Sequence, residues 1–485
     1  KSGGGCVNIA AFVSRCHNMR KTKIICTIGP KTESFDQLSE LAAAGMDIVR
    51  LNMSHASHDS AAKIIRSIKT LNRKLASPIA VLLDTQGPEI RTGNITEELE
   101  LKTGSEVTIS VRDDSDVEAS SIRIDYSDLV SALNEGDRIT VDNGIINMDV
   151  LAKNPNGTLN CRIVDGGILK SKRHVNLPGI RVNLPAITKK DKADILFALA
   201  EQVDFIALSF VRSADDIREL KQLLGRKAGK IKIIAKIEDQ SGVTNLDEIL
   251  SEVDGIMIAR GDLGVEINLA ELPNVQRQIV KRCAEEGKRV IVATHLLESM
   301  IENPIPTRAE VTDVANAIYE EVDAVMLSGE TAMGKHPVRC VEQLVSIAKV
   351  TEQFPGLNFT GNLRRSSDKQ QLAANAVELA ENLAAKGIVV ITRRGLMADY
   401  ITSCHPQATR IFAFTNDSQT RRRLMLNRNV SPIRSAFSQD PEKTLTTAFK
   451  LLRDKGEIES GDKVVVISDI LAGAGIDAIQ IRLIP

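Results

Sequence analysis

The chain has 485 residues, 43% hydrophobic and 26% charged, which is an ordinary composition for a globular protein of two or three domains. Its formal net charge of −1 creates no overall attraction to nucleic acid or to an anionic membrane surface. No apolar run approaches the about 20 residues that a membrane-spanning helix needs. We therefore expect neither nucleic acid nor membrane among the partners.

The cysteines and the N-terminal segment bear on the compartment. The seven Cys residues are widely separated and form no Cys-x-x-Cys pair, which favours reduced thiols in a reducing compartment. Residues 1–19 include three consecutive Gly but lack an apolar stretch followed by a small-residue cleavage site, so we interpret them as a flexible N-terminal leader. The expected location is the cytoplasm. An organelle such as a plastid stays open as the alternative if a targeting peptide was removed.

Eight short runs rich in Val, Ile and Leu recur along the chain, and segments with helical periodicity separate most of them. The runs cover residues 23–29, 47–53, 79–85, 205–211, 233–238, 255–262, 290–295 and 324–330. Each run is about as long as one buried parallel strand. Alternating strands and helices predict an α/β fold with a parallel sheet, and eight units favour a closed (β/α)8 TIM barrel over an open doubly wound sheet.

The rhythm changes between residues 88 and 184, where Thr, Val and Ile alternate between turn signals. This pattern predicts antiparallel strands at residues 99–111, 138–141, 145–150 and 159–164, with turns at 154–157 and 166–167. We interpret the segment as a small β-barrel domain inserted after the third barrel strand. An insertion at the carboxyl end of a strand would lie over the barrel mouth, where it could act as a lid.

A third domain follows the sequence Phe354-Pro355-Gly356. Helical patterns at residues 372–385 and 441–453 alternate with strand patterns at 388–392, 410–415 and 463–468. We predict a C-terminal α/β domain over residues 355–485. The barrel would then comprise residues 20–87 and 185–354.

Polar residues close most of the predicted barrel strands. They include Arg50, Asn52, Ser54, His55, Asp84, Thr85, Arg91, Lys236, Glu238, Asp262, Thr294, His295 and Glu330. In a barrel these strand ends converge on one face, where active sites are built. Charges beside buried strands are costly unless they are paired or bound to a ligand, so this face is the predicted functional site.

The residue types indicate phosphoryl transfer. Glu238 and Asp262 supply hard oxygen ligands that suit Mg2+, or Mn2+, better than zinc. Three cationic side chains can hold phosphate oxygens: Arg50, Arg91 and Lys236. A second oxygen-rich set carries one formal charge and fits a monovalent cation: Asn52, Ser54, Asp84 and Thr85. Cations without an evident nucleophile are the groups that catalyse phosphoryl transfer by positioning and electrostatics.

Each of these features also has a structural interpretation. A single Arg or Asp at a strand end is often part of an ion pair, and His55 and His295 are also typical of ordinary loops. Ser209 and the other strand-end serines lack a nucleophile elbow. Residues 224–230 look like a phosphate-binding loop, but the glycine spacing is short by one and Ile231 replaces Ser or Thr. We interpret them as a helix end followed by a basic turn.

Several separated motifs closely resemble the pyruvate kinase family. They cover residues 21–30, 83–93, 256–266, 293–310 and 326–332, and the resemblance extends in order from about residue 20 to residue 485. It implies transfer of a phosphoryl group from phosphoenolpyruvate to ADP, giving pyruvate and ATP in the last step of glycolysis. It also implies dependence on Mg2+ and K+, and a homotetramer.

The resemblance assigns substrate and metal roles to matching residues. Lys236 would contact the transferring phosphoryl group and stabilise the enolate, Arg50 would hold the phosphate, and Thr294 would lie near the methylene carbon that receives a proton. Glu238 and Asp262 would bind Mg2+. The backbone N–H groups of Gly261 and Asp262 would receive the substrate carboxylate.

The resemblance also assigns the second cation and the nucleotide. Asn52, Ser54, Asp84 and Thr85 would coordinate K+, and Glu89 is the acid found in K+-dependent members. The nucleotide phosphates would contact Asn52, Ser54, His55, Arg91, Lys172 and Arg173. The chain departs from the common family pattern at Gln86, Asn143 and His295. None of these departures removes a metal ligand or Lys236, so activity is still expected.

A possible regulatory site lies in the C-terminal domain, at Thr392, Arg393, Arg394 and Gly395. Here a predicted strand meets a helix, which is a natural anion site, and the segment resembles the family's sugar-phosphate effector loop. The partner loop at residues 469–477 lacks the Trp and Arg found in binders of fructose-1,6-bisphosphate. We therefore hypothesise a sugar monophosphate effector, with a solvated Arg pair as the alternative.

Two other functions remain alternatives to an active pyruvate kinase. A metal-dependent aldolase acting on phosphoenolpyruvate or pyruvate would use Glu238 and Asp262, but it leaves Lys236 and the inserted domain unexplained. A non-catalytic regulatory subunit that senses sugar phosphates would not need Lys236, Glu238, Asp262 and Thr294, all of which are present.

Overall fold

The computed structural model describes residues 20–95, 97–111, 121–142, 144–180, 182, 184–468 and 478–485. The predicted leader, Asn143 and the loop at 469–477 lie outside the described residues. In the described part of the chain, no helix combines the length and the apolar character needed to cross a membrane.

Eight parallel strands close into a barrel in the order β1-β17-β16-β15-β14-β13-β3-β2, which confirms the predicted TIM barrel. The strands are β1 (Lys23–Thr27), β2 (Ile48–Asn52), β3 (Ala80–Asp84), β13 (Phe205–Leu208), β14 (Lys232–Ile237), β15 (Gly255–Ala259), β16 (Arg289–Ala293) and β17 (Ala324–Leu327). Each predicted run overlaps one of these strands. Most runs extend past the observed carboxyl end, because the polar residues there belong to the loops that form the site.

Helices surround the barrel as the alternating pattern predicts. They are α2 (Phe35–Ala44), α3 (His58–Leu71), α5 (Lys189–Glu201), α6 (Ala214–Leu224), η1 (Gly225–Lys230), α7 (Gln240–Thr244), α8 (Leu246–Glu252), α9 (Arg260–Glu266), η2 (Leu269–Glu271), α10 (Leu272–Glu286), η3 (Glu298–Ile301), α11 (Arg308–Tyr319), α12 (Gly329–Ala332), α13 (Pro337–Thr351) and η4 (Phe359–Asn362). Helix α6 ends at Leu224, and Gly225 follows with φ 54°, so the loop-like basic segment is a helix end and a 3-10 turn.

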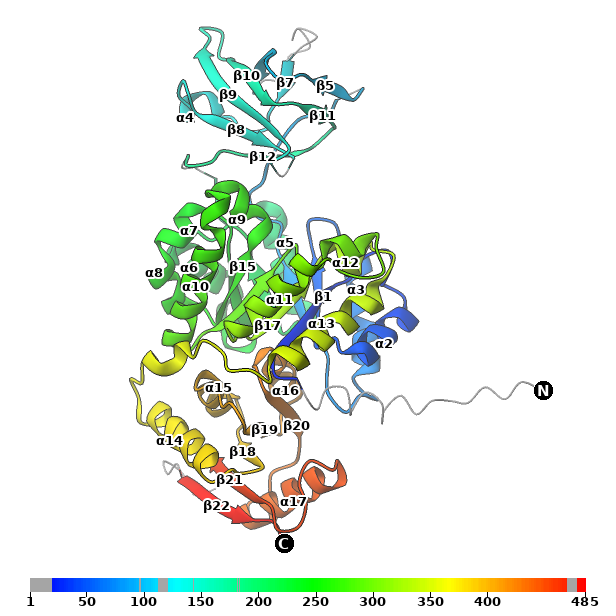
Figure 1. Ribbon diagram of the computed structural model, residues 1–485, viewed down its shortest axis with the longest axis vertical. Helices are drawn as coiled ribbons and strands as arrows, with labels where there is room; N and C mark the ends of the chain where they lie inside the picture. The colour runs from blue at the N-terminus through cyan, green and yellow to red at the C-terminus, as the bar shows by residue number, and fades with distance from the viewer. Residues whose placement is uncertain are drawn as a thin grey trace, which may run out of the picture.

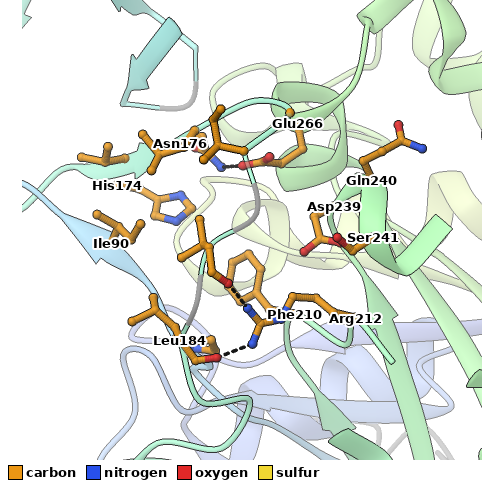
Figure 2. A pocket seen from close by; sticks show the side chains of 16 residues that line it. Ile90, His174, Asn176, Leu184, Phe210, Arg212, Asp239, Gln240, Ser241 and Glu266 are labelled. Atoms are coloured by element: carbon orange, nitrogen blue, oxygen red, sulfur yellow. Dashed lines mark hydrogen bonds between the residues drawn. The ribbon is translucent and has the colours of Figure 1, made fainter. Parts of the chain in front are cut away.

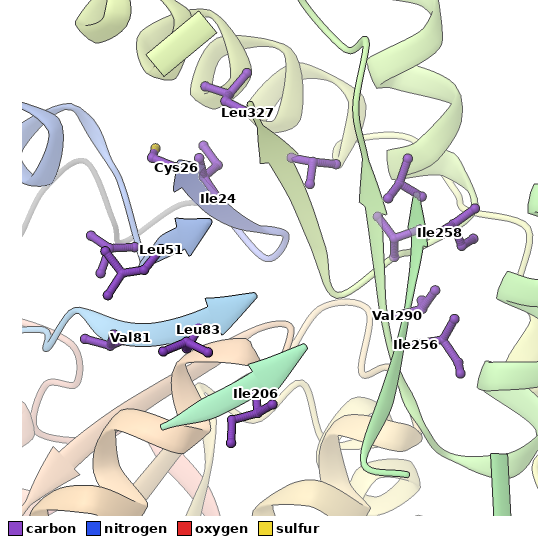
Figure 3. Packing of buried hydrophobic residues seen from close by; sticks show 14 of the residues in the cluster. Ile24, Cys26, Leu51, Val81, Leu83, Ile206, Ile256, Ile258, Val290 and Leu327 are labelled. Atoms are coloured by element: carbon purple, nitrogen blue, oxygen red, sulfur yellow. The ribbon is translucent and has the colours of Figure 1, made fainter. Parts of the chain in front are cut away.

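The barrel strands are buried on both faces, which explains their nearly continuous apolar runs. Side chains alternate along each strand. Ile24, Cys26 and Leu83 point outward into the layer between strands and helices (Figure 3), whereas Ile25 and Leu82 belong to the cluster inside the barrel. The packed interior makes the strands rigid supports for the loops at their carboxyl ends.

Residues after β3 form the inserted domain, which lies at one end of the barrel (Figure 1). Its strands make a seven-stranded sheet in the order β4-β12-β8-β9-β10-β6-β7 and a two-stranded sheet of β11 and β5. Their bounds are β4 (Ile90–Arg91), β5 (Leu99–Leu101), β6 (Glu106–Ser110), β7 (Ser121–Arg123), β8 (Arg138–Val141), β9 (Ile146–Lys153), β10 (Leu159–Asp165), β11 (Gly167–Leu169) and β12 (His174–Asn176), with the short helix α4 (Leu129–Ala132). The single strand predicted at 99–111 is wrong, because a turn at Gly104 (φ 84°) divides it into β5 and β6.

The C-terminal domain lies at the opposite end of the barrel (Figure 1) and contains a five-stranded sheet in the order β20-β19-β18-β21-β22. Its elements are α14 (Asp368–Asn382), β18 (Gly387–Ile391), α15 (Leu396–Ser403), β19 (Arg410–Thr415), α16 (Ser418–Arg423), η5 (Leu424–Leu426), β20 (Val430–Arg434), α17 (Pro441–Asp454), β21 (Lys463–Ser468) and β22 (Ala478–Leu483). The predicted α/β architecture is confirmed. The exact domain limits at residues 88, 185 and 355 stay predictions.

The C-terminal domain closes the amino end of the barrel. Met425 and Leu426 are almost fully buried and belong to the cluster inside the barrel. Beside them, Arg422 Nε donates to both carboxylate oxygens of Asp204, at 2.9 and 3.0 Å, and Asp204 also accepts from the backbone N–H of Val81 at 3.0 Å. The barrel core and the C-terminal domain therefore share one packed base.

Replacing Asp204 with Ala is expected to lower the free energy of unfolding by about 2–3 kcal/mol, because it removes a charged acceptor and leaves a buried N–H unpaired. Asp204 is about 1% exposed. Urea unfolding followed by circular dichroism measures the change. Asp215→Ala is the matched control, because it removes the exposed ion pair with Arg218 and is expected to change the midpoint little. Equal midpoints for the two variants would contradict the prediction.

Candidate functional site

Four charged side chains from β2, β3 and the end of β14 meet at the carboxyl end of the barrel. Arg50 Nε donates to Asp84 Oδ2 at 2.6 Å. Lys236 Nζ lies 3.2 Å from Asp84 Oδ1 and 2.9 Å from Glu238 Oε1. All four groups are at least nine-tenths buried. Residues far apart in the sequence thus form one continuous chain of opposite charges, as the strand-end pattern predicts.

The electrostatics of this chain reflect its burial. Burial alone would raise the pKa of Asp84, but the charges of Lys236 and Arg50 outweigh it and lower the pKa. Burial would lower the pKa of Lys236, but Asp84 and Glu238 hold it above its ordinary value. Burial raises the pKa of Glu238 even beside Lys236, and the carboxylates of Asp262 and Asp84 add to that rise. A further positive charge beside Glu238 would therefore stabilise its ionised form.

The donor set fits a divalent cation at Glu238 and Asp262. Asp262 stands at the start of α9, close enough to influence the pKa of both Lys236 and Glu238. Its nearest ion-pair partner is His174 of the inserted domain, whose Nδ1 lies 3.9 Å from Asp262 Oδ1. The described residues contain no group of three or more His, Cys, Asp or Glu arranged to hold a metal. Two protein carboxylates leave the remaining positions of a Mg2+ ion to substrate and water.

Ser209 also belongs to the site, although the sequence pattern around it indicates no role. Its hydroxyl lies 2.6 Å from Lys236 Nζ and 3.4 Å from Asp84 Oδ1, and it donates to the carbonyl oxygen of Thr85 at 2.7 Å. The next residue, Phe210, has φ 51° and donates its N–H to Glu238 Oε2 at 2.6 Å. The available signal was position, because both residues directly follow β13.

Thr294 sits at the end of β16 in a strained conformation, with φ 66°. Its hydroxyl donates to the carbonyl of Ala293 at 2.6 Å and accepts from Gly261 N–H at 2.7 Å. Arg260 Nη2 donates to the Thr294 carbonyl at 2.7 Å, which helps to hold this backbone. The Gly261 N–H predicted to receive a substrate carboxylate thus pairs with Thr294 in this structure.

The oxygen-rich set after β2 and β3 is also brought together. Asn52 and Asp84 are register partners in adjacent strands. Asn52 Oδ1 accepts from the N–H of Ser54 at 3.1 Å, and His55 N–H bonds to the carbonyl of Asn52 at 3.2 Å. Thr85 Oγ1 accepts from the N–H of Ser209 at 3.1 Å. One carboxylate with several neutral oxygens is a donor set that suits K+.

Three of the predicted nucleotide residues belong to the inserted domain: Arg91 is in β4, and Lys172 and Arg173 directly precede β12, which pairs with β4. Arg91 pairs with Glu89 at 2.5 Å and donates from Nη1 to the carbonyl of Lys172 at 2.9 Å. Gln86 Nε2 donates to the same Glu89 carboxylate at 3.3 Å. The neutral amide of Gln86 therefore joins this network without adding charge. Arg173 pairs with Asp142 within the inserted domain, at 3.4 Å.

Clefts separate the inserted domain from the barrel. One, of about 810 Å³, is lined by Arg138, Gly261 and His295 among others. A second, of about 170 Å³, lies beside it (Figure 2). In Figure 2 Asn176 Nδ2 donates to Glu266 Oε1 across the gap at 2.7 Å. The Arg212 guanidinium donates to the carbonyl of Val182, at 2.6 Å, and to that of Leu184. These contacts connect the inserted domain to the barrel.

Burial raises the pKa of Glu266 to about 7, although the hydrogen bond from Asn176 opposes the rise. Because folding raises this pKa, protonation of Glu266 stabilises the folded state. That contribution is complete below the ordinary pKa of a Glu and is lost as the pH rises through about 7. Glu266 is therefore a partly buried acid lining both clefts, distinct from the charge chain around Lys236.

The predicted effector residues lie far from this site, between β18 and α15. Gly395 has φ 89° and donates its N–H to Thr392 Oγ1 at 3.1 Å. Thr392 is fully buried, whereas Arg393 and Arg394 are exposed. The loop thus presents two Arg side chains beside the start of a helix.

Comparison with known proteins agrees with this geometry. Residues 19–341 match the family model "Pyruvate kinase, barrel domain", and residues 370–481 match "Pyruvate kinase, alpha/beta domain". The chain is 41% identical to "Pyruvate kinase isozyme G, chloroplastic" of Nicotiana tabacum over 92% of this chain and 80% of that protein. It is 42% identical to "Pyruvate kinase" of Geobacillus stearothermophilus over 94% of this chain and 78% of that protein. The chain therefore belongs to the pyruvate kinase family of phosphotransferases.

Proposed function

We propose that this chain transfers the phosphoryl group of phosphoenolpyruvate to ADP, giving pyruvate and ATP, with Mg2+ (or Mn2+) and K+ as cofactors. The observation that supports it most is the buried chain Arg50–Asp84–Lys236–Glu238 at the barrel mouth. A transferring phosphoryl group and a developing enolate carry dispersed negative charge. Fixed positive groups in a water-poor site stabilise that charge more in the transition state than in the ground state.

Each residue then has a role that its position supports. Arg50 holds the phosphate of phosphoenolpyruvate. Lys236 contacts the phosphoryl group during its transfer and stabilises the enolate that is left. A divalent cation held by Glu238 and Asp262 would neutralise charge on the substrate carboxylate and phosphate. Thr294 lies near the carbon that takes a proton, and Gly261 frees its N–H for the substrate carboxylate when the Thr294 contact opens.

The second cation and the nucleotide occupy the neighbouring loops. Asn52, Ser54, Asp84 and Thr85 supply the oxygens for K+. The nucleotide phosphates are held by Asn52, Ser54, His55, Arg91, Lys172 and Arg173. The inserted domain acts as a lid: a cleft separates it from the barrel, and its closure over that cleft would exclude water from the phosphoryl group.

A coupled assay for pyruvate, starting from phosphoenolpyruvate and ADP with and without K+, tests this function. We expect turnover that requires both a divalent cation and K+. Cleavage or condensation of a carbon skeleton without ADP would instead support the aldolase alternative. Sugar-phosphate binding without any turnover would support the regulatory alternative.

We also propose a sugar monophosphate effector at Thr392, Arg393, Arg394 and Gly395. The support is the exposed Arg pair next to the N-terminus of α15, where backbone N–H groups favour anions. Replacing Arg393 with Ala is expected to raise the half-activating concentration of a hexose or pentose phosphate about tenfold, through loss of a charge-assisted contact. Activity titrations measure it, with Lys450→Ala of α17 as the control. A wild type that ignores these sugar phosphates, with Arg393→Ala equally silent, would reject the effector.

Assembly and location are extensions of the same proposal. We propose a homotetramer, as the family resemblance implies, and a cytoplasmic location with a plastid as the alternative. Proteins similar to this chain include both a bacterial enzyme and ones named chloroplastic or plastidial, such as "Plastidial pyruvate kinase 2" of Arabidopsis thaliana, 39% identical over 92% of this chain and 78% of that protein.

A further inference from the structure

The first turn of α5 is bonded to the loop that follows β2. Lys190 Nζ donates to the carbonyl oxygen of Met53 at 2.5 Å and to Asp194 Oδ2 at 2.8 Å. Met53 lies between Asn52 and Ser54, two residues that the proposed function assigns to K+ and nucleotide. The ammonium group is therefore attached to the backbone of the candidate binding loop itself.

Asp194 connects the same cluster to the far end of that loop. Its side chain is 3% exposed, and Oδ1 lies 2.7 Å from Nε2 of His58, the first residue of α3. The His58 ring stacks on Phe197 of α5, with ring centroids 4.5 Å apart and planes 4° from parallel. Lys190 and Asp194 thus hold the loop where it leaves β2 and again where it enters α3.

The neighbouring residue Asp191 holds the second loop of the site. Asp191 Oδ1 accepts from the N–H groups of Gln86 and Gly87, each at 3.1 Å, directly after the proposed K+ ligands Asp84 and Thr85. Its other oxygen accepts from the N–H of Thr188 at 2.9 Å and completes the cap of α5. One helical turn therefore fixes the spacing between the two loops that carry the oxygen-rich set.

These contacts differ from an ordinary surface ion pair. An exposed Lys–Asp pair four residues apart on a helix contributes little and would not affect a distant site. Here the carboxylate of Asp194 is buried, and the ammonium of Lys190 has a backbone carbonyl of the loop as a second partner. Supporting contacts of this kind orient the groups that touch a ligand.

We propose that Lys190, held by Asp194, is a positioning residue that sets the loop from Asn52 to His55 for K+ and ADP. The inference rests on the proposed function of that loop. Without Lys190, the Met53 carbonyl loses its anchor and the oxygens of Asn52 and Ser54 must be ordered by the ligands themselves. That ordering weakens the binding of both ligands and leaves the phosphoenolpyruvate side, around Arg50 and Lys236, unaffected.

Three variants of the full chain test the proposal. In Lys190→Met, the half-saturating K+ concentration and the KM for ADP are each expected to rise about tenfold, the size expected for a lost hydrogen bond to a charged group. The KM for phosphoenolpyruvate and the melting temperature are expected to stay near wild type. Lys190→Arg should restore most of the ADP affinity. Lys192→Met is the matched control, because Lys192 lies in the same turn and pairs with Glu219 instead, at 3.6 Å.

Calorimetric titration of ADP into the Mg2+-loaded protein separates this proposal from the function on which it rests, because it needs no turnover. Weaker ADP binding in Lys190→Met than in Lys192→Met supports the positioning role even if the wild type proves inactive or indifferent to K+. Equal ADP affinity in these two variants overturns it, even if the wild type is a fully active K+-dependent enzyme.

Discussion

Replacing Lys236 with Met is expected to lower kcat by at least about 1,000-fold while changing the KM for phosphoenolpyruvate only modestly. Among the described residues, the Lys236 ammonium is the one cation in contact with both Asp84 and Glu238, and it stands where the proposed transfer places the phosphoryl group. A contact made mainly in the transition state affects kcat and kcat/KM together. Steady-state kinetics with saturating ADP, Mg2+ and K+ measure both constants.

A folding defect is the main competing cause, because Met leaves the carboxylate of Glu238 without its cation. Arg50 still pairs with Asp84, so part of the charge chain remains. Melting curves of the variant, and phosphoenolpyruvate binding measured by calorimetry, distinguish a folded but inactive protein from a collapsed site. Substantial turnover by a folded Lys236→Met protein would refute the role assigned to this lysine.

Much of the fold was predictable because barrel strands are buried on both faces and therefore appear as continuous apolar runs. Each of the eight predicted runs overlaps a strand, and the polar groups at their carboxyl ends converge as expected. The strand order also brought Asp84 and Lys236 into contact, although 152 positions separate them. The prediction worked where a residue's strand and end determined its location.

The failures have physical reasons of another kind. Ser209 joins the charge chain through a hydroxyl, and one Ser after a strand gives no pattern that separates it from an ordinary loop residue. The strand predicted at 99–111 failed because local alternation continues across Gly104, whose positive φ turns the chain. Met425 and Leu426 belong to the 3-10 turn η5 and carry no local signal of their destination, so only tertiary packing reveals that they close the barrel. Contacts between domains depend on arrangement and so lie beyond local patterns.

Replacing Glu238 with Gln is expected to raise the Mg2+ concentration required for half-maximal activity by about 100-fold or more. The amide keeps an oxygen that can accept from Phe210 N–H, now 2.6 Å away, but it removes the negative charge that a divalent cation requires. Its NH2 group also faces the ammonium of Lys236, where two donors cannot bond. Activity titrated with Mg2+ and with Mn2+, together with direct Mn2+ binding by electron paramagnetic resonance, measures the loss.

Two further variants decide whether the metal is the cause. Glu238→Asp keeps the charge and is expected to recover part of the metal affinity with a lower kcat, because its shorter side chain cannot reach both Lys236 and the cation. Glu266→Gln removes a different, partly buried acid that pairs with Asn176 of the inserted domain, and is expected to leave the Mg2+ requirement unchanged. If Glu238→Gln bound Mn2+ as tightly as Glu266→Gln does, the divalent site would have to lie elsewhere. The charge chain would then serve only to position Lys236.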